Sequence, residues 1–254
     1  MLRARIAEGN RDALMGEQRI EIHMKDSGDG NGGDQPPNAS RASRKIAKRS
    51  KHSSRGGVVV QLPCEPHPRV VLFESKLEQR VLFLILARAD VWDLREQPPA
   101  FLYRGDCGRL RQHTFDFLVE LSSGRRIAVA VKPFKLARER NFVRELRAVR
   151  RALTKDYAHD LVLITERDFT TIEALNAQRL HEIRRGLDCA VAAEVHEAIQ
   201  KSDFPTTLRA LVSDLPNPGY AFRAAFVAIY DNALVADKST PIDLDTQVHR
   251  GKRL

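Results

Sequence analysis

The stretch TFDFLVELSSGRRIAVAVKPF, residues 114–134, constrains the fold more than any other part of this chain. Two runs of alternating apolar residues flank the polar segment SSGRR, a pattern that predicts a β-hairpin. The first run begins near Asp116 and the second ends at Lys132, so the turn brings both side chains to one end of the hairpin. Aspartate is depleted in strands, and a half-buried aspartate needs a partner or a cation. An Asp116 on an edge strand facing water would need neither.

The second strand places Ala128, Ala130 and Lys132 on one face, because side chains alternate along a strand. The two alanines are small and leave room for another group to approach. Lys132 has two interpretations: it marks the exposed exit of the strand, or it acts together with Asp116.

A helix is predicted over residues 74–90, ESKLEQRVLFLILARAD, where apolar residues recur at helical spacing. Ser75 and Glu78 fit the S-x-x-E capping box, in which the serine caps the helix and the glutamate reaches back to the backbone. Glu78 is therefore a capping residue or a second carboxylate beside Asp116, and Glu74 is a nearby alternative acid. Two carboxylates and a lysine would hold a hard cation such as Mg²⁺ next to a substrate phosphate.

The order of the remaining elements predicts a mixed α/β core whose sheet is covered by helices. The core elements are expected as short extended segments at 91–105, one amphipathic helix at 135–156, an apolar strand at 160–166 and a helix at 171–185. After Gly186, short apolar helices precede two small strands at 234–238 and 246–250, which is the layout of a winged-helix module.

We therefore expect three parts. Residues 1–56 form a disordered basic leader, because their Gly-, Asp- and Pro-rich stretch cannot bury a core. Residues 57–168 form the α/β core, and residues 169–254 form a small, mainly helical, winged-helix-like domain.

The net charge of +9 is concentrated in residues 41–56, which hold seven Lys or Arg and no acid. Such a segment either binds nucleic-acid phosphates through counterion release or is a solvated tail. The helix predicted at 135–156 carries arginines at helical spacing, opposite an apolar stripe. They either face solvent or contact DNA phosphates, which positions DNA without reading its sequence. These residues are Arg140, Arg144, Arg147 and Arg151.

Other classes of protein are excluded by simpler features. No apolar run is long enough to span a bilayer, so no membrane association is expected. The three scattered cysteines, Cys64, Cys107 and Cys189, give neither a disulfide framework nor a zinc pattern and suit a reducing cytoplasm.

Four short motifs, taken in order, resemble the N-terminal domain of TnsA-type transposon endonucleases. They are ESKLE at 74–78, EQP at 96–98, FDF at 115–117 and AVKP at 130–133. The resemblance covers about residues 70–165 and implies a restriction-endonuclease-like fold with the PD-(D/E)xK core, so that 57–168 is an endonuclease-like domain.

The resemblance also implies an activity. Glu78, Asp116 and Lys132 would be catalytic, and Glu78 and Asp116 would bind Mg²⁺ or Mn²⁺. Such enzymes are cytoplasmic, act on double-stranded DNA at the bacterial nucleoid, and cut one strand at each transposon end beside a separate transposase. The C-terminal domain resembles one whose expected partners are an assembly-regulator ATPase and, as a second alternative, DNA.

One departure from the family pattern bears on the chemistry. Ala130 stands where the family has Glu, Asp or Gln, and alanine cannot bind a metal. Glu139 or Glu145 on the following helix would be candidates to compensate. Two alternatives follow: a catalytically impaired DNA-binding or assembly subunit with the same fold, and a defence or repair nuclease built on the same core.

Overall fold

The computed structural model describes residues 35–44, 54–105, 108–139 and 142–252. Its strands are β1 (Gly56–Val60), β2 (Arg69–Phe73), β3 (Val91–Glu96), β4 (Phe101–Arg104), β5 (Leu110–His113), β6 (Phe117–Leu121), β7 (Arg126–Val131), β8 (Asp160–Ile164), β9 (Thr206–Thr207), β10 (Leu234–Val235) and β11 (Gln247–Arg250). Its helices are α2 (Lys76–Leu86), α3 (Phe134–Glu139), α4 (Phe142–Ala152), α5 (Thr171–Arg184), α6 (Cys189–Lys201), α7 (Leu208–Val212) and α8 (Pro218–Tyr230).

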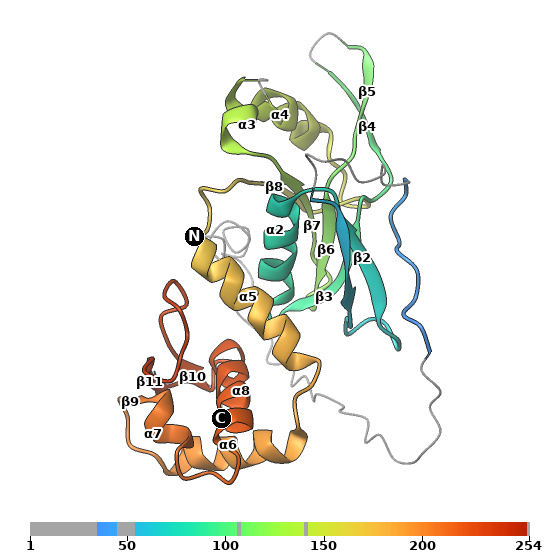
Figure 1. Ribbon diagram of the computed structural model, residues 1–254. Helices are drawn as coiled ribbons and strands as arrows, with labels where there is room; N and C mark the ends of the chain where they lie inside the picture. The colour runs from blue at the N-terminus through green and yellow to red at the C-terminus, as the bar shows by residue number, and fades with distance from the viewer. Residues whose placement is uncertain (1–34, 45–53, 106–107, 140–141, 253–254) are drawn as a thin grey trace.

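The central sheet has the strand order β3-β6-β7-β8 (Figure 1). The predicted hairpin is confirmed as β6 and β7, which pair antiparallel with Phe117 opposite Val129. Strand β8 pairs parallel with β7. The chain therefore leaves β7 and β8 at the same end of the sheet, and Asp116 enters β6 at that end. All groups discussed below as a candidate active site lie there.

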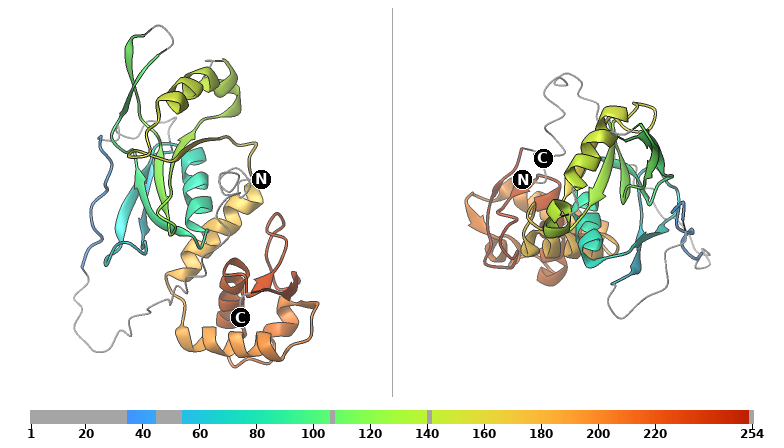
Figure 2. Two further views of the ribbon diagram at one scale, coloured as in Figure 1. Left: turned by 180° about the vertical axis from the view of Figure 1, so that it is seen from behind. Right: turned by 90° about the horizontal axis from the view of Figure 1, so that it is seen from above.

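Apolar side chains cover both faces of the sheet, as expected for a mixed α/β core. On one face, Val129 and Val131 of β7 pack with the buried side of α2, and α5 lies against α2 (Figure 1). On the other face, Ala128 and Ala130 pack with α4, including Phe142. The β4–β5 hairpin extends beyond the sheet next to α4 (Figures 1 and 2).

The C-terminal part has its own apolar cluster, built from α6, α7, α8 and the small strands, to which α5 contributes Leu180 and Ile183. The elements follow in the order α6, β9, α7, α8, β10, β11, and the strands form an antiparallel sheet in the order β10-β11-β9. The predicted pair of small strands is confirmed. Among the described residues, no helix is long and apolar enough to cross a membrane.

Two predictions about local structure were wrong. The first was disorder through the leader: residues 35–44 lie against the core, where Asn38 bridges to Arg69 and Ser43 N–H donates to the Gln97 carbonyl at 2.9 Å. Residues 1–34 and 45–53 lie outside the described residues. The second was a single helix over 135–156, where the described residues instead form the separate helices α3 and α4.

Candidate active site

Asp116 immediately precedes β6, and main-chain hydrogen bonds hold it on both sides. Its N–H donates to the Val129 carbonyl at 3.0 Å, and its carbonyl accepts from Gln97 N–H at 2.9 Å. Its carboxylate Oδ2 accepts from Val131 N–H at 2.6 Å. Asp116 is thus anchored to β7, the strand that ends at Lys132, and its half-buried side chain has a defined position.

The electrostatic environment of Asp116 opposes its negative charge. Burial, followed by the nearby Glu78 carboxylate, raises its pKa to about 7, although the Val131 N–H and the charge of Lys132 act in the opposite direction. Glu74 adds to the repulsion. The structure therefore brings Glu78, Asp116 and Lys132 into one electrostatic environment, as the sequence predicted.

Glu78 is buried at the first turn of α2, and the N-cap of this helix is Ser75. The predicted hydrogen bond from Ser75 N–H to the Glu78 carboxylate is not formed. Glu78 makes these contacts instead. Its N–H donates to Ser75 Oγ at 3.1 Å, and its Oε1 accepts from the same hydroxyl at 2.8 Å. Its Oε2 accepts from Glu74 N–H at 2.7 Å, one residue before the position that a capping box would use. Burial is the first cause that raises the pKa of Glu78 above its usual range. Each carboxylate oxygen keeps a lone pair beyond its hydrogen bond, so these contacts leave Glu78 able to bind a cation.

Lys132 follows the last residue of β7, and its N–H donates to the Ile164 carbonyl of β8 at 3.1 Å. Its ammonium lies over the ring of Phe142, 5.1 Å from the ring centroid. The side chain is half-buried. Lys132 is therefore held at the exit of the strand by both the sheet and α4, within electrostatic range of Asp116.

The surroundings of Ala130 differ from the prediction. Ala130 is 1% exposed and lies in the apolar cluster with Ala137 and Phe142, so neither it nor Ala128 leaves room for an approaching group. Position 130 is filled by packing and supplies no polar atom to the site.

Neither acid that was proposed to replace a ligand at position 130 takes that role. Glu139 is exposed and pairs with Lys135 at 3.9 Å. Glu145 lies 2.9 Å from His113 Nδ1. The second carboxylate that acts on Asp116, after Glu78, is instead Glu74, which the sequence offered only as an alternative to Glu78.

The segment 35–44 contacts Glu74 through the side chain of Arg44. Arg44 Nη2 donates to Glu74 Oε2 at 2.7 Å, and Arg44 Nε donates to Gln97 Oε1 at 2.9 Å. Gln97 is buried with a positive φ of 41°, a strained conformation for a residue other than glycine. Because its N–H also holds the Asp116 carbonyl, Gln97 links the segment to the site. Sequence reasoning missed this role of the EQP motif.

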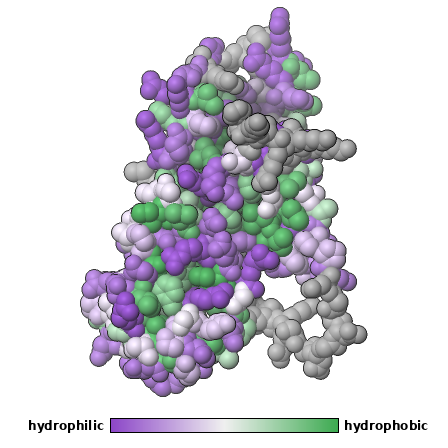
Figure 3. All heavy atoms as spheres, viewed as in Figure 1, coloured by the Kyte–Doolittle hydropathy of each residue, from purple (hydrophilic) through white to green (hydrophobic). Residues whose placement is uncertain are grey.

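For three of the four arginines predicted to contact DNA, the structure confirms the position opposite the apolar face. Arg144, Arg147 and Arg151 are exposed on α4, opposite its buried apolar residues. Arg140 lies outside the described residues. Two further exposed arginines, Arg138 on α3 and Arg167 after β8, follow the ends of β7 and β8 and were not selected from the sequence. Figure 3 shows hydrophilic residues at this end of the molecule and also over the rest of the visible face.

A pH dependence follows from the raised pKa of Asp116. A carboxyl whose pKa is higher in the folded than in the unfolded protein contributes stability below pH 3.8 that is lost as the pH rises to about 7. In EDTA, Asp116→Asn should therefore gain stability relative to the wild type over this range, by at least about 1 kcal/mol. Calorimetric unfolding of both proteins between pH 5 and pH 8 would measure it. A stability difference that does not change with pH would contradict the burial of a charged Asp116.

The side chains fit a two-carboxylate metal site. Within the part of the chain that the structure describes, no three or more His, Cys, Asp or Glu side chains form a ready metal cluster. Mg²⁺, however, is commonly held by one or two carboxylates with water and substrate phosphate. Glu78 and Asp116 repel each other in a half-buried place, and a divalent cation would relieve that repulsion.

Comparison with known proteins adds no assignment. No protein-family model matches the sequence, and no match is found among curated proteins.

Proposed function

We propose that this protein is a Mg²⁺- or Mn²⁺-dependent DNA endonuclease of the TnsA type, which cuts one strand at transposon ends together with a partner transposase. The observation that carries the proposal is the convergence of Glu78, Asp116 and Lys132 at one end of the β6–β7 hairpin, with the pKa of Asp116 raised to about 7. Carboxyls with perturbed pKa values beside a lysine are typical of functional sites. The mixed sheet, with helices on both faces, is compatible with the restriction-endonuclease-like fold.

In this proposal the side chains of the site divide the chemistry between them. Asp116 and Glu78 hold the metal ion, which would activate a water molecule and stabilise the charge that develops on phosphorus. Lys132 orients the attacking water or neutralises the phosphate oxygens. Gln97 positions Asp116 through its main chain, and Glu74 adds negative charge that favours cation binding.

The C-terminal part is proposed to be a winged-helix domain that binds a protein rather than DNA. The element order α6-β9-α7-α8-β10-β11 and the strand order β10-β11-β9 support the winged-helix assignment. Helix α8, which would read DNA in such a module, is mostly buried. Residues 169–254 also hold ten Lys and Arg against eleven Asp and Glu, so the domain lacks the basic excess of a DNA-binding surface. An assembly-regulator ATPase is the partner that the resemblance implies.

The direct test is a nicking assay on a supercoiled plasmid that carries both transposon ends. Wild-type protein and partner transposase should nick it in Mg²⁺ or Mn²⁺ and should leave it intact in EDTA. The transposase alone, with Mg²⁺, gives the background from the other strand. If adding the wild-type protein never raises nicking above that background, the nuclease assignment is wrong.

A second candidate function is supported by Ala130, because that position supplies no polar ligand. In that case the protein is a DNA-binding or assembly subunit that has lost cleavage. It would bind DNA in a strongly salt-dependent way but would not bind Mg²⁺. Titration calorimetry decides between the two: a Mg²⁺ site present in the wild type and lost in Asp116→Asn supports the nuclease.

A further inference from the structure

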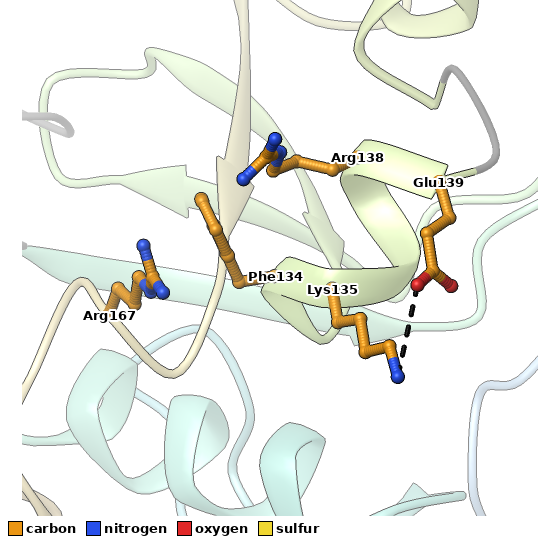
Figure 4. Close-up of a pocket in the computed structure, with 5 residues that line it drawn as sticks. All are labelled: Phe134, Lys135, Arg138, Glu139 and Arg167. Atoms are coloured by element: carbon orange, nitrogen blue, oxygen red, sulfur yellow. Dashed lines mark ion pairs between the residues drawn. The ribbon is translucent and has the colours of Figure 1, made fainter.

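A second feature of the catalytic end is an open cleft of about 540 Å³ beside α3. It is lined by Phe134, Lys135, Arg138, Glu139 and Arg167 (Figure 4). Phe134 comes two residues after Lys132, and Arg167 comes shortly after the end of β8. Since β7 and β8 are parallel neighbours, the cleft lies outside their carboxyl ends, where open α/β sheets bind ligands.

Two guanidinium groups converge on the Phe134 ring within this cleft. Arg167 Cζ lies 3.6 Å from the ring centroid and Arg138 Cζ lies 5.8 Å from it. Figure 4 shows the two arginines approaching the ring from different elements, while Lys135 and Glu139 lie together elsewhere on α3. The ring thus restricts both arginines through cation–π contact.

The acids near the cleft have other partners. Glu139 pairs with Lys135 at 3.9 Å. Glu166 Oε2 accepts from Phe134 N–H at 2.8 Å. The cleft therefore presents the positive charges of two exposed arginines. Guanidinium groups match the geometry of phosphate oxygens.

We propose that Arg138 and Arg167 form a phosphate-binding cleft that holds the DNA backbone next to the scissile phosphate. This inference rests on the proposed nuclease function. The ligand chemistry is a phosphodiester. Phe134 follows Lys132 by two residues, and the cleft lies at the carboxyl ends of β7 and β8, so it would adjoin the cut. The cleft fixes the register of the strand without reading its bases.

The test measures binding of a fluorescent DNA duplex by anisotropy in EDTA, from 50 to 200 mM salt. Arg138→Gln/Arg167→Gln is compared with the wild type and with Arg209→Gln, an exposed arginine that pairs with Asp245 in the C-terminal part. Each lost phosphate contact should reduce the slope of log affinity against log salt by about 0.9. The double variant should therefore lose about 1.8 in slope and bind DNA at least about tenfold more weakly at 100 mM salt, whereas Arg209→Gln should match the wild type.

The outcomes separate this inference from the proposed function. Unchanged slope and affinity in the double variant, with an unchanged melting temperature, would overturn the cleft. Titration with inorganic phosphate distinguishes the source: tight phosphate binding lost in the double variant, with duplex binding intact, would also overturn a DNA-backbone site. Failure of Asp116→Asn to reduce nicking would refute the nuclease but would leave the salt slope as a separate result.

Discussion

Replacing Asp116 with asparagine is expected to lower Mg²⁺-dependent nicking by at least about 10³-fold. Stabilisation of developing charge by a bound metal ion contributes several kcal/mol, and about 4 kcal/mol corresponds to that factor. In the wild type, Val131 N–H donates to the Asp116 carboxylate at 2.6 Å. The side-chain oxygen of asparagine can accept the same hydrogen bond, so the strand geometry is preserved. Only the charge that binds the cation is removed. The measurement is the initial rate of plasmid nicking with the partner transposase.

Asp160→Asn is the matched control for this variant. Asp160 begins β8 opposite Ile127, at the other end of the same sheet, and pairs there with Arg125 and Arg150. The Asp160→Asn variant loses the same charge from the same sheet and should nick DNA at the wild-type rate. DNA binding in EDTA should be similar in all three proteins. Equal nicking by wild type and Asp116→Asn would show that Asp116 holds no catalytic metal.

The features that could be predicted from the sequence are those set by local pattern. Alternation of apolar residues identified the β6–β7 hairpin and, with it, the common end at which Asp116 and Lys132 lie. The S-x-x-E spacing identified Ser75 as the cap of α2, and the bond from Glu78 N–H to the Ser75 hydroxyl confirms this. These inferences hold because each depends on residues that are close in sequence.

The features that were missed depend on partners far away in the chain. Segment 35–44 has the composition of a flexible linker, yet Arg41 forms a bidentate pair with Asp93 at 2.8 and 2.9 Å. Local composition contains no information about such a partner. The break between α3 and α4 was missed for a related reason: the apolar and arginine stripes keep helical spacing across it, so periodicity gives no signal there.

The packing around Ala130 could not be predicted from the alternation of residues along its strand alone. Alternation correctly placed Ala128, Ala130 and Lys132 on one face, but it could not show that α4 covers the two alanines. The same alternation could not show that Gln97, from a different strand connection, holds the Asp116 main chain. The EQP motif thus positions the main chain of Asp116 and supplies no metal ligand of its own.

The largest effect on stability is expected at Arg69, whose side chain is 1% exposed. It pairs with Glu96 Oε2 at 2.9 Å and with Glu65 Oε2 at 3.0 Å, and it also donates to the Leu94 carbonyl. Glu96 is completely buried and also accepts from the Ser40 hydroxyl at 2.5 Å. Arg69→Met would leave Glu96 as a buried charge without its cation. Removing one partner of a buried ion pair costs about 3–5 kcal/mol.

Urea unfolding at pH 7, followed by the fluorescence of Trp92, the only tryptophan, would measure this loss. Arg88→Met is the control, because the Arg88–Asp90 pair is partly exposed and should contribute less than about 1 kcal/mol. The double variant Arg69→Met/Glu96→Leu should recover most of the lost stability, since it removes the unpaired charge. Gln97 follows Glu96 directly and holds Asp116, so Arg69→Met should also reduce nicking under conditions where it remains folded. If Arg69→Met unfolds at the wild-type urea concentration, the buried pair does not stabilise this end of the sheet.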